Sequence, residues 1–150
     1  MSAKWPLVTV GIATYNGSKY LADSLRSIIS GDYPNIEILI VDDGSSDESV
    51  AIAERFDDSR LRIIANESNS GLVRTRQQIV KEAQGEYLAW LDQDDVAYPS
   101  RIATQVAFLE RNERVGVCGS QTLHRVHEPS GKEWLLKTSG TLCDHEEIRA

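Results

Sequence analysis

The sequence predicts an α/β domain in which a mostly parallel β-sheet is flanked by helices and followed by a C-terminal hairpin. Two observations lead to this prediction. Short runs of β-branched and apolar residues alternate with longer stretches whose apolar residues recur every three or four positions. Turn-forming residues separate these segments, an arrangement typical of parallel strands joined by right-handed helical crossovers.

The individual elements follow from the local patterns. The expected strands are short and apolar, and they cover residues 7–13, 36–41, 61–65, 87–91 and 115–119. The expected helices have an apolar face, and they cover residues 18–30, 48–56, 72–84 and 99–112. Ser18 is the expected cap of the first helix, and Pro99 is the expected first-turn residue of the last one. After residue 120, a turn at 128–131 between two short extended runs, 121–127 and 132–138, predicts an antiparallel hairpin.

The composition is that of a globular domain with a single core. The chain has 150 residues, of which 41% are hydrophobic and 26% are charged. A net charge of −7 argues against a nucleic-acid partner, which needs a basic face. No apolar run approaches the roughly 20 residues of a membrane-spanning helix. Cys118 and Cys143 have no metal-binding spacing and are expected to be reduced thiols of a cytoplasmic protein, with a single disulfide as the alternative.

Acidic side chains follow two of the expected strands. Asp42 and Asp43 follow one strand, and Asp92, Asp94 and Asp95 follow another. Because the carboxyl ends of parallel strands share one edge of a sheet, we expect these carboxylates to lie together. Their mutual repulsion favours a bound cation, and Mg²⁺ or Mn²⁺ carrying a phosphorylated ligand suits such hard oxygen donors. The sequence contains neither GxGxxG nor a P-loop, so a nucleotide must be held in another way.

Each of these features also has a purely structural interpretation. Asp, Gly and Ser are common turn residues, and an aspartate of the second cluster would suit the cap of the next helix. Arg74 and Arg76 are either solvated residues of a helix surface or ligands of a phosphate, and Arg76 is the preferred candidate. Tyr15 either stacks on a base or packs beneath its turn.

Several stretches occur in a fixed order along the chain. They are Val8–Asn16, Ile40–Asp47, Asn69–Leu72 with Arg76, Gly85–Asp95, and Pro99 with Arg101. Taken together, they resemble the nucleotide-sugar-binding part of inverting family 2 glycosyltransferases, which have the Rossmann-like GT-A fold.

The resemblance implies transfer of a sugar from a UDP- or dTDP-type donor to the hydroxyl of a saccharide or lipid-linked saccharide. The residues that it implies for nucleotide-sugar binding are Ala13, Thr14, Tyr15, Asn16, Asp42, Asp43, Gly71, Arg76, Asp92, Gln93 and Asp94. Asp92 and Asp94 would hold Mg²⁺ or Mn²⁺, which stabilises charge on the departing diphosphate. Either Asp42 or Asp43 would read the base.

The resemblance also implies two regions, a donor-binding α/β region over 1–120 and the start of an acceptor-side region over 121–150. Inversion requires a carboxylate base, and no matching acidic motif follows residue 120. Residues 144–150 begin a helix that stops after about two turns, so we expect a truncated chain. We expect the base beyond Ala150 and a fragment that binds the donor without turning it over. The expected setting is cell-surface polysaccharide synthesis, in the cytoplasm or peripherally at the inner face of the membrane.

Two other functions are compatible with the pattern. A nucleotidyltransferase also places metal-bound carboxylates on an α/β sheet, although Thr14–Gly17 is a poor version of its glycine-rich phosphate loop. A non-catalytic module would bind a nucleotide without turnover. Metal-dependent binding of UDP distinguishes the transferase from both.

Overall fold

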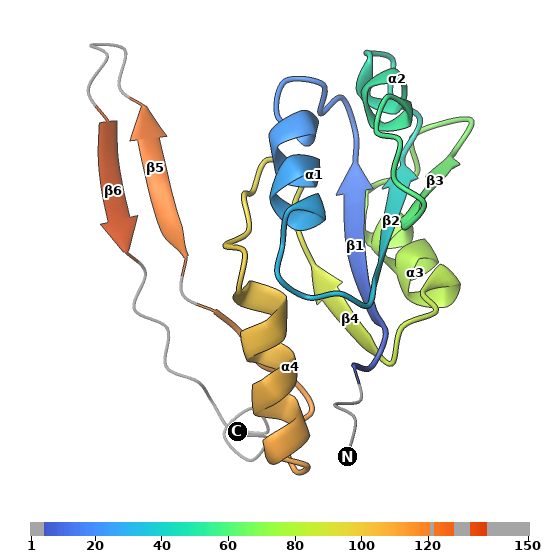
Figure 1. The fold of residues 1–150 in the computed structure, drawn as a ribbon. Coiled ribbons are helices and arrows are strands. Elements are labelled where there is room, and N and C mark those ends of the chain that lie inside the picture. Colours follow the sequence, from blue (N-terminus) through green and yellow to red (C-terminus); the bar gives the residue numbers. More distant parts are fainter. Residues whose placement is uncertain (1–4, 121, 128–132, 138–150) are drawn as a thin grey trace. The chain divides into compact units, whose positions relative to one another are not determined.

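The computed structural model describes residues 5–120, 122–127 and 133–137 (Figure 1). The chain divides into two compact units, Met1–Ile102 and Ala103–Ala150. The first unit contains a four-stranded sheet, and the second contains most of one helix together with a two-stranded sheet.

The four-stranded sheet is entirely parallel. Its strands are β1 (Val8–Thr14), β2 (Ile36–Asp42), β3 (Leu61–Ala65) and β4 (Tyr87–Trp90), in the order β3-β2-β1-β4. The two central strands, β1 and β2, are almost completely buried, because helices cover both faces of the sheet. Their apolar and β-branched side chains therefore form the core.

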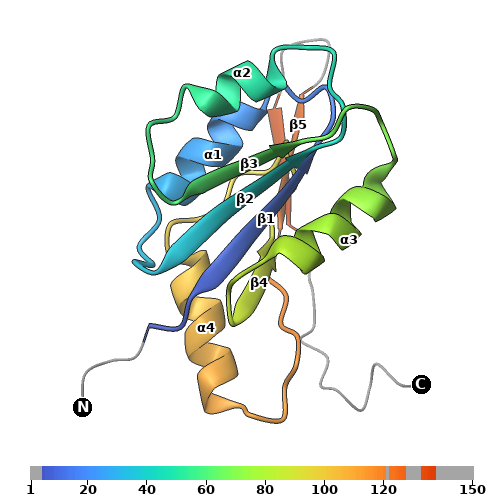
Figure 2. The ribbon, with the colours of Figure 1, turned by 90° about the vertical axis from the view of Figure 1, so that its right-hand side faces the viewer.

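The helices lie on opposite faces of this sheet (Figure 2). Helices α1 (Leu21–Ile29) and α2 (Ser49–Glu54) cover one face, and α3 (Leu72–Glu82) covers the other. The crossovers from β1 to β2 and from β2 to β3 move the chain in one direction across the sheet. The crossover from β3 to β4 runs in the opposite direction and places β4 on the other side of β1. Right-handed crossovers that run in opposite directions put their helices on opposite faces. The direction of winding thus switches between β1 and β4.

Helix α3 packs closely against β1 at Gly11. A Cβ atom added to Gly11 would lie 2.5 Å from Cγ2 of Ile79, which is completely buried on α3. The missing side chain therefore allows the helix to approach the strand.

The predicted α/β class, the parallel sheet and its flanking helices are confirmed, with shifts at some ends. Ser18 does not cap α1, because the helix begins at Leu21, its N-cap residue is Tyr20, and no side chain makes a capping hydrogen bond there. Pro99 lies in a turn before α4 (Arg101–Arg111) rather than in its first turn. Strand β4 is only partly buried, because it lies at the edge of the four-stranded sheet.

The predicted strand over residues 115–119 is wrong. These residues form no strand, and within the described part of the chain no β-ladder includes them. The side chain of Val117 is 71% exposed. A β-branched run becomes a strand only when it pairs with a neighbour and buries a face, and this run does neither.

In the second unit, β5 (Leu123–His127) pairs antiparallel with β6 (Glu133–Lys137). The predicted turn at 128–131, Cys143 and the predicted helix start at 144–150 lie outside the described residues. The thiol of Cys118 lies 3.9 Å from the carbonyl oxygen of Gln105. Among the described residues, none of the helices has both the length and the apolar character needed to span a bilayer.

Candidate functional site

A pocket of about 280 Å³ lies where the winding of the sheet switches direction, beyond the carboxyl ends of β1 and β4. In open parallel sheets this is the usual place for a ligand, because the crossovers on either side diverge and leave a crevice. The residues that line the pocket are Ala13, Thr14, Tyr15, Asp43, Asn69, Leu72, Thr75, Arg76, Asp92, Gln93 and Asp94.

The pocket brings together most, but not all, of the residues expected from the sequence. Asn16, Asp42 and Gly71 were expected in the site and do not line it. Asn16 and Gly71 lie in adjoining loops, and Asp42 is the last residue of β2. Three further lining residues, Asn69, Leu72 and Thr75, were not among the expected ones. The loop before α3 and the first turn of that helix supply them, and the helical spacing of four residues between Gly71 and Thr75 could have indicated Thr75.

Asp43 is buried at the pocket wall, and the loop before α3 surrounds its carboxylate. Oδ1 accepts hydrogen bonds from the backbone N–H of Ser70 at 2.9 Å and from its hydroxyl at 2.8 Å. Oδ2 accepts from the N–H of Gly71 at 2.7 Å. Burial raises the pKa of Asp43, but hydrogen bonds from Ser70, Gly71 and Asn66 outweigh it and lower the pKa below its ordinary value. The carboxylate is therefore charged and fixed in orientation.

Asp42 turns away from the pocket into its own loop. Its Oδ2 accepts from the backbone N–H of Ser45 at 2.8 Å, and its Oδ1 accepts from the Ser45 hydroxyl at 2.5 Å. The tight turn that follows depends on Gly44, which has a φ of +72°. Of the two adjacent aspartates, Asp43 faces the pocket and Asp42 stabilises the turn.

The loops after β1 and β2 are joined by reciprocal hydrogen bonds. Asn16 donates its backbone N–H to the Ser45 hydroxyl at 2.9 Å and accepts from the N–H of Ser46 at 2.9 Å. Asp47 accepts from the N–H of Ser18 at 3.0 Å and from the Ser49 hydroxyl at 2.5 Å. Burial acts against ionisation of Asp47, but these hydrogen bonds outweigh it and lower its pKa to about 2.

Asp92 forms an ion pair with Arg76 across the pocket rim. Nη2 of Arg76 donates to Oδ1 of Asp92 at 2.7 Å, and the two side chains are 41% and 58% exposed. The guanidinium also lies 5.5 Å from the centroid of the Trp90 ring, within the range of a cation–π interaction. Thus one cation and one acidic side chain already compensate each other in this pocket.

Gln93 faces the end of β1. Its Oε1 accepts from the Thr14 hydroxyl at 2.7 Å and from the backbone N–H of Tyr15 at 3.0 Å. Its Nε2 donates to the carbonyl of Tyr15 at 3.4 Å. The residue between the two acidic positions therefore links the loop after β4 to the loop after β1.

The described residues fit a metal ion only in part. No group of three or more His, Cys, Asp or Glu side chains among them is arranged to hold one. However, Asp94 is exposed at the pocket, and it makes no hydrogen bond or ion pair with any described residue. Oδ2 of Asp92 accepts no hydrogen bond from these residues either. Carboxylate oxygens are what Mg²⁺ and Mn²⁺ prefer, and such ions usually complete their shell with water and substrate phosphates. The donor chemistry therefore fits, provided that a ligand supplies the remaining oxygens.

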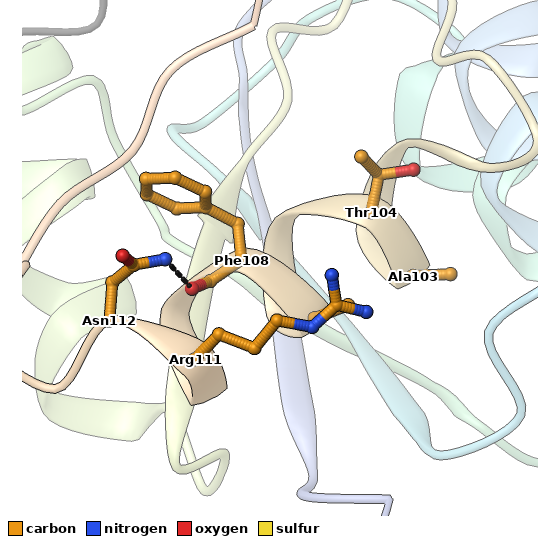
Figure 3. A pocket seen from close by; sticks show the side chains of 6 residues that line it. Ala103, Thr104, Phe108, Arg111 and Asn112 are labelled. Atoms are coloured by element: carbon orange, nitrogen blue, oxygen red, sulfur yellow. Dashed lines mark hydrogen bonds between the residues drawn. The ribbon is translucent and has the colours of Figure 1, made fainter.

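A second pocket lies along one face of α4 (Figure 3). All of its lining residues come from one stretch of chain, residues 103–112. Asn112 donates its side-chain amide to the carbonyl of Phe108 at 2.7 Å, and Arg111 adds one charge. Polar groups from different elements do not converge there, so the pocket beyond β1 and β4 is the candidate site.

The chain belongs to glycosyltransferase family 2. The model of the family described as "Glycosyl transferase family 2" matches residues 9–142. An uncharacterized glycosyltransferase of Haemophilus influenzae is 37% identical over 117 residues, which are 77% of this chain and 36% of that protein.

Two solved structures share the fold. Residues 1–349 of Staphylococcus aureus TarS in complex with UDP-GlcNAc give a TM-score of 0.68 at 30% identity, covering 71% of this chain and 32% of that one. The mannosyltransferase PcManGT of Pyrobaculum calidifontis, in complex with GDP-Man and Mn²⁺, gives a TM-score of 0.69 at 26% identity, covering 76% and 35%. The chain thus spans well under half of each of these relatives.

Proposed function

We propose that this chain is the donor-binding part of an inverting glycosyltransferase that moves a sugar from a UDP- or dTDP-type donor to an acceptor hydroxyl. The observation that carries the proposal is the convergence of Asp43, Arg76, Asp92 and Asp94 on one pocket at the switch point of the sheet. The complex of TarS with UDP-GlcNAc supports this choice of donor, since TarS shares both the fold and 30% of the aligned residues.

The base of the nucleotide occupies the side of the pocket formed by Ala13, Thr14 and Tyr15. Tyr15 is 46% exposed, and its aromatic ring supplies the surface on which the base stacks. Asp43 accepts a hydrogen bond from an N–H of the base, because its ionised carboxylate is the acidic group that faces this side. The hydrogen bonds from Ser70 and Gly71 hold that carboxylate in place before the ligand arrives.

The diphosphate lies toward Arg76, Asp92 and Asp94. Arg76 supplies the positive charge, and the two carboxylates supply the oxygen ligands of Mg²⁺ or Mn²⁺. When bound, the metal acts as a Lewis acid that stabilises the charge on the departing diphosphate. The side chains of this chain bind and orient the donor, and a carboxylate base takes the proton of the acceptor hydroxyl. We place the reaction in cell-surface polysaccharide synthesis, with a saccharide or lipid-linked saccharide as acceptor.

Thermal unfolding in the presence of nucleotides tests the proposal. UDP, dTDP and GDP are each added with Mn²⁺, and the measurement is repeated with EDTA. A ligand at a hundred times its dissociation constant adds about 2.7 kcal/mol of stability, which shifts the melting temperature by several degrees. We expect UDP or dTDP to stabilise the protein and EDTA to remove most of the effect. Stabilisation by none of the three nucleotides would contradict donor binding, and stabilisation that survives EDTA would contradict the metal.

A further inference from the structure

Gln93 occupies the place where the backbone ladder between β1 and β4 has ended. The last residue pair of that ladder is Gly11 with Trp90, and one further backbone hydrogen bond joins the N–H of Leu91 to the carbonyl of Gly11 at 3.1 Å. Strand β1 continues beyond this point to Thr14, but β4 does not accompany it. The side-chain amide of Gln93 instead pairs with Thr14 and with both backbone polar groups of Tyr15.

Thr14 gives Gln93 a rigid anchor. Thr14 is 2% exposed, it pairs with Asp42 in the β1–β2 ladder, and its carbonyl accepts from the N–H of Asp43 at 2.8 Å. The position of Gln93 is also shaped by Gly17, because a Cβ atom at Gly17 would lie 2.3 Å from Oε1 of Gln93. The amide is thus held between a buried strand end and a residue without a side chain.

The polar capacity of Gln93 is largely used by these contacts. Its carbonyl oxygen has two lone pairs and already accepts two hydrogen bonds, from Thr14 and from Tyr15. Of the two N–H groups on Nε2, one donates to the carbonyl of Tyr15, so three of the four hydrogen-bonding positions of the amide are used within the protein. The chain neighbours of Gln93 are Asp92 and Asp94, so the contacts of Gln93 position the backbone that carries these two acids relative to Tyr15.

We infer that Gln93 is a positioning residue that sets the separation between the base-binding side of the pocket, around Tyr15, and the acidic side, around Asp92 and Asp94. This inference rests on the proposed function. A nucleoside diphosphate must meet both sides at once, and a fixed separation lets the second contact form without a further entropic cost. The amide acts through Tyr15 and the acidic loop rather than on the donor.

Three probes separate this role from direct recognition. Uridine reports on the base side, Mn²⁺-pyrophosphate reports on the acidic side, and UDP with Mn²⁺ requires both. In Gln93→Met, which has a similar length but no hydrogen-bonding group, we expect uridine and Mn²⁺-pyrophosphate to bind within twofold of wild type. The affinity for UDP with Mn²⁺ should fall about tenfold or more, because the advantage of joining the two parts is lost. Dissociation constants come from NMR and calorimetric titrations.

Two further variants keep the test decisive. Gln93→Asn retains the amide but is one methylene shorter, so it should show the same pattern even if Gln93→Met fails to fold. Gln77→Met is the matched control, since Gln77 is exposed on α3 and does not line the pocket. Unchanged UDP affinity in the foldable Gln93 variants, or an equal loss for uridine alone, would overturn the inference. If wild-type protein binds neither UDP nor dTDP with Mn²⁺, the proposed function fails instead, and if it binds only dTDP, the same comparison is made with thymidine and dTDP.

Discussion

Arg76 holds Asp92 at 2.7 Å while its guanidinium lies over the ring of Trp90. Asp43, which unlike Asp92 is buried, is compensated by N–H groups of Ser70 and Gly71. Repulsion among the carboxylates therefore does not by itself require a cation. In the proposed function, Asp94 and Asp92 favour a metal because their carboxylate oxygens are the donors that Mg²⁺ and Mn²⁺ prefer.

Asp92→Asn should weaken nucleotide binding while leaving stability nearly unchanged. The ion pair with Arg76 is largely exposed, and exposed pairs contribute only about 0–1 kcal/mol. We expect the free energy of unfolding in urea to fall by less than about 1 kcal/mol, and calorimetry to show weaker binding of UDP with Mn²⁺. Asp23→Asn is the matched control, because Asp23 and Arg26 form a similarly exposed ion pair on α1. Equal UDP affinity in both variants would remove Asp92 from the site.

Asp43→Asn should destabilise the protein. The backbone N–H groups of Ser70 and Gly71 now donate to the two oxygens of Asp43. In the variant, the new amide NH₂ would face at least one of these donors, which would then have no acceptor. Leaving a buried donor unsatisfied costs about 1–3 kcal/mol. Urea denaturation measures the loss, and Asp57→Asn, at an exposed position on the surface, should change stability by less than about 0.5 kcal/mol. If Asp43→Asn were as stable as wild type, the loop before α3 would not depend on this carboxylate.

Stability should decrease at acid pH, and Asp47 should contribute to the decrease. The pKa of Asp47 in the folded protein is about 2, below its value in the unfolded chain. Because the unfolded state then binds the proton first, this contribution is complete above about pH 4 and is lost as the pH falls toward 2. Asp43 and Asp58, whose pKa values are also lowered, contribute with the same sign.

The measurement is the urea midpoint from pH 6 to pH 2.5 for wild type and for Asp47→Asn. The variant should be less stable at pH 6 and should lose less stability on acidification. Since Asp47 is exposed, solvent screening keeps the difference small, about 1 kcal/mol or less. Parallel curves for the two proteins would contradict the assigned hydrogen bonds.

Gly44→Ala should destabilise the loop that carries Asp42 and Asp43. Gly44 has a φ of +72°, and a Cβ atom there would lie 2.6 Å from the carbonyl carbon of Ser68. Backbone strain of this kind costs about 1–3 kcal/mol, to which the clash adds. Gly119→Ala is the control, because a Cβ atom at Gly119 meets nothing within 4 Å. Thermal unfolding should separate the two variants clearly, and equal melting temperatures would argue against this loop geometry.

Asp94→Asn should abolish the Mn²⁺-dependent part of nucleotide binding without loss of stability. The carboxylate of Asp94 is exposed and makes no hydrogen bond or ion pair with the residues that the structure describes, so the fold does not depend on it. We expect UDP affinity in the variant to be the same with Mn²⁺ and with EDTA. Glu67→Gln, an exposed acid outside the pocket lining, should keep the response of wild type to the metal. A full Mn²⁺ response in Asp94→Asn would assign the metal to other residues.

The sequence alone determined the α/β class and the sheet edge that carries the pocket. Apolar strands and amphipathic helices each have a characteristic spacing of apolar residues, and this spacing can be read directly from the sequence. The expectation that Asp43 and Asp92 share an edge followed from the parallel topology, and both line the pocket. Local pattern failed at residues 115–119, because a strand also needs a partner and the described sheet supplies none for them.

Only the tertiary structure decided which acid faces the pocket and what each polar group contacts. Asp42 and Asp43 are adjacent and chemically identical, and their roles differ because of their hydrogen-bond partners. Asp42 accepts from Ser45, whereas Asp43 accepts from Ser70 and Gly71. The pairing of Gln93 with Tyr15 joins residues that lie far apart in the chain. Such contacts depend on how loops from different strands meet in space, and no periodicity in the sequence encodes that meeting.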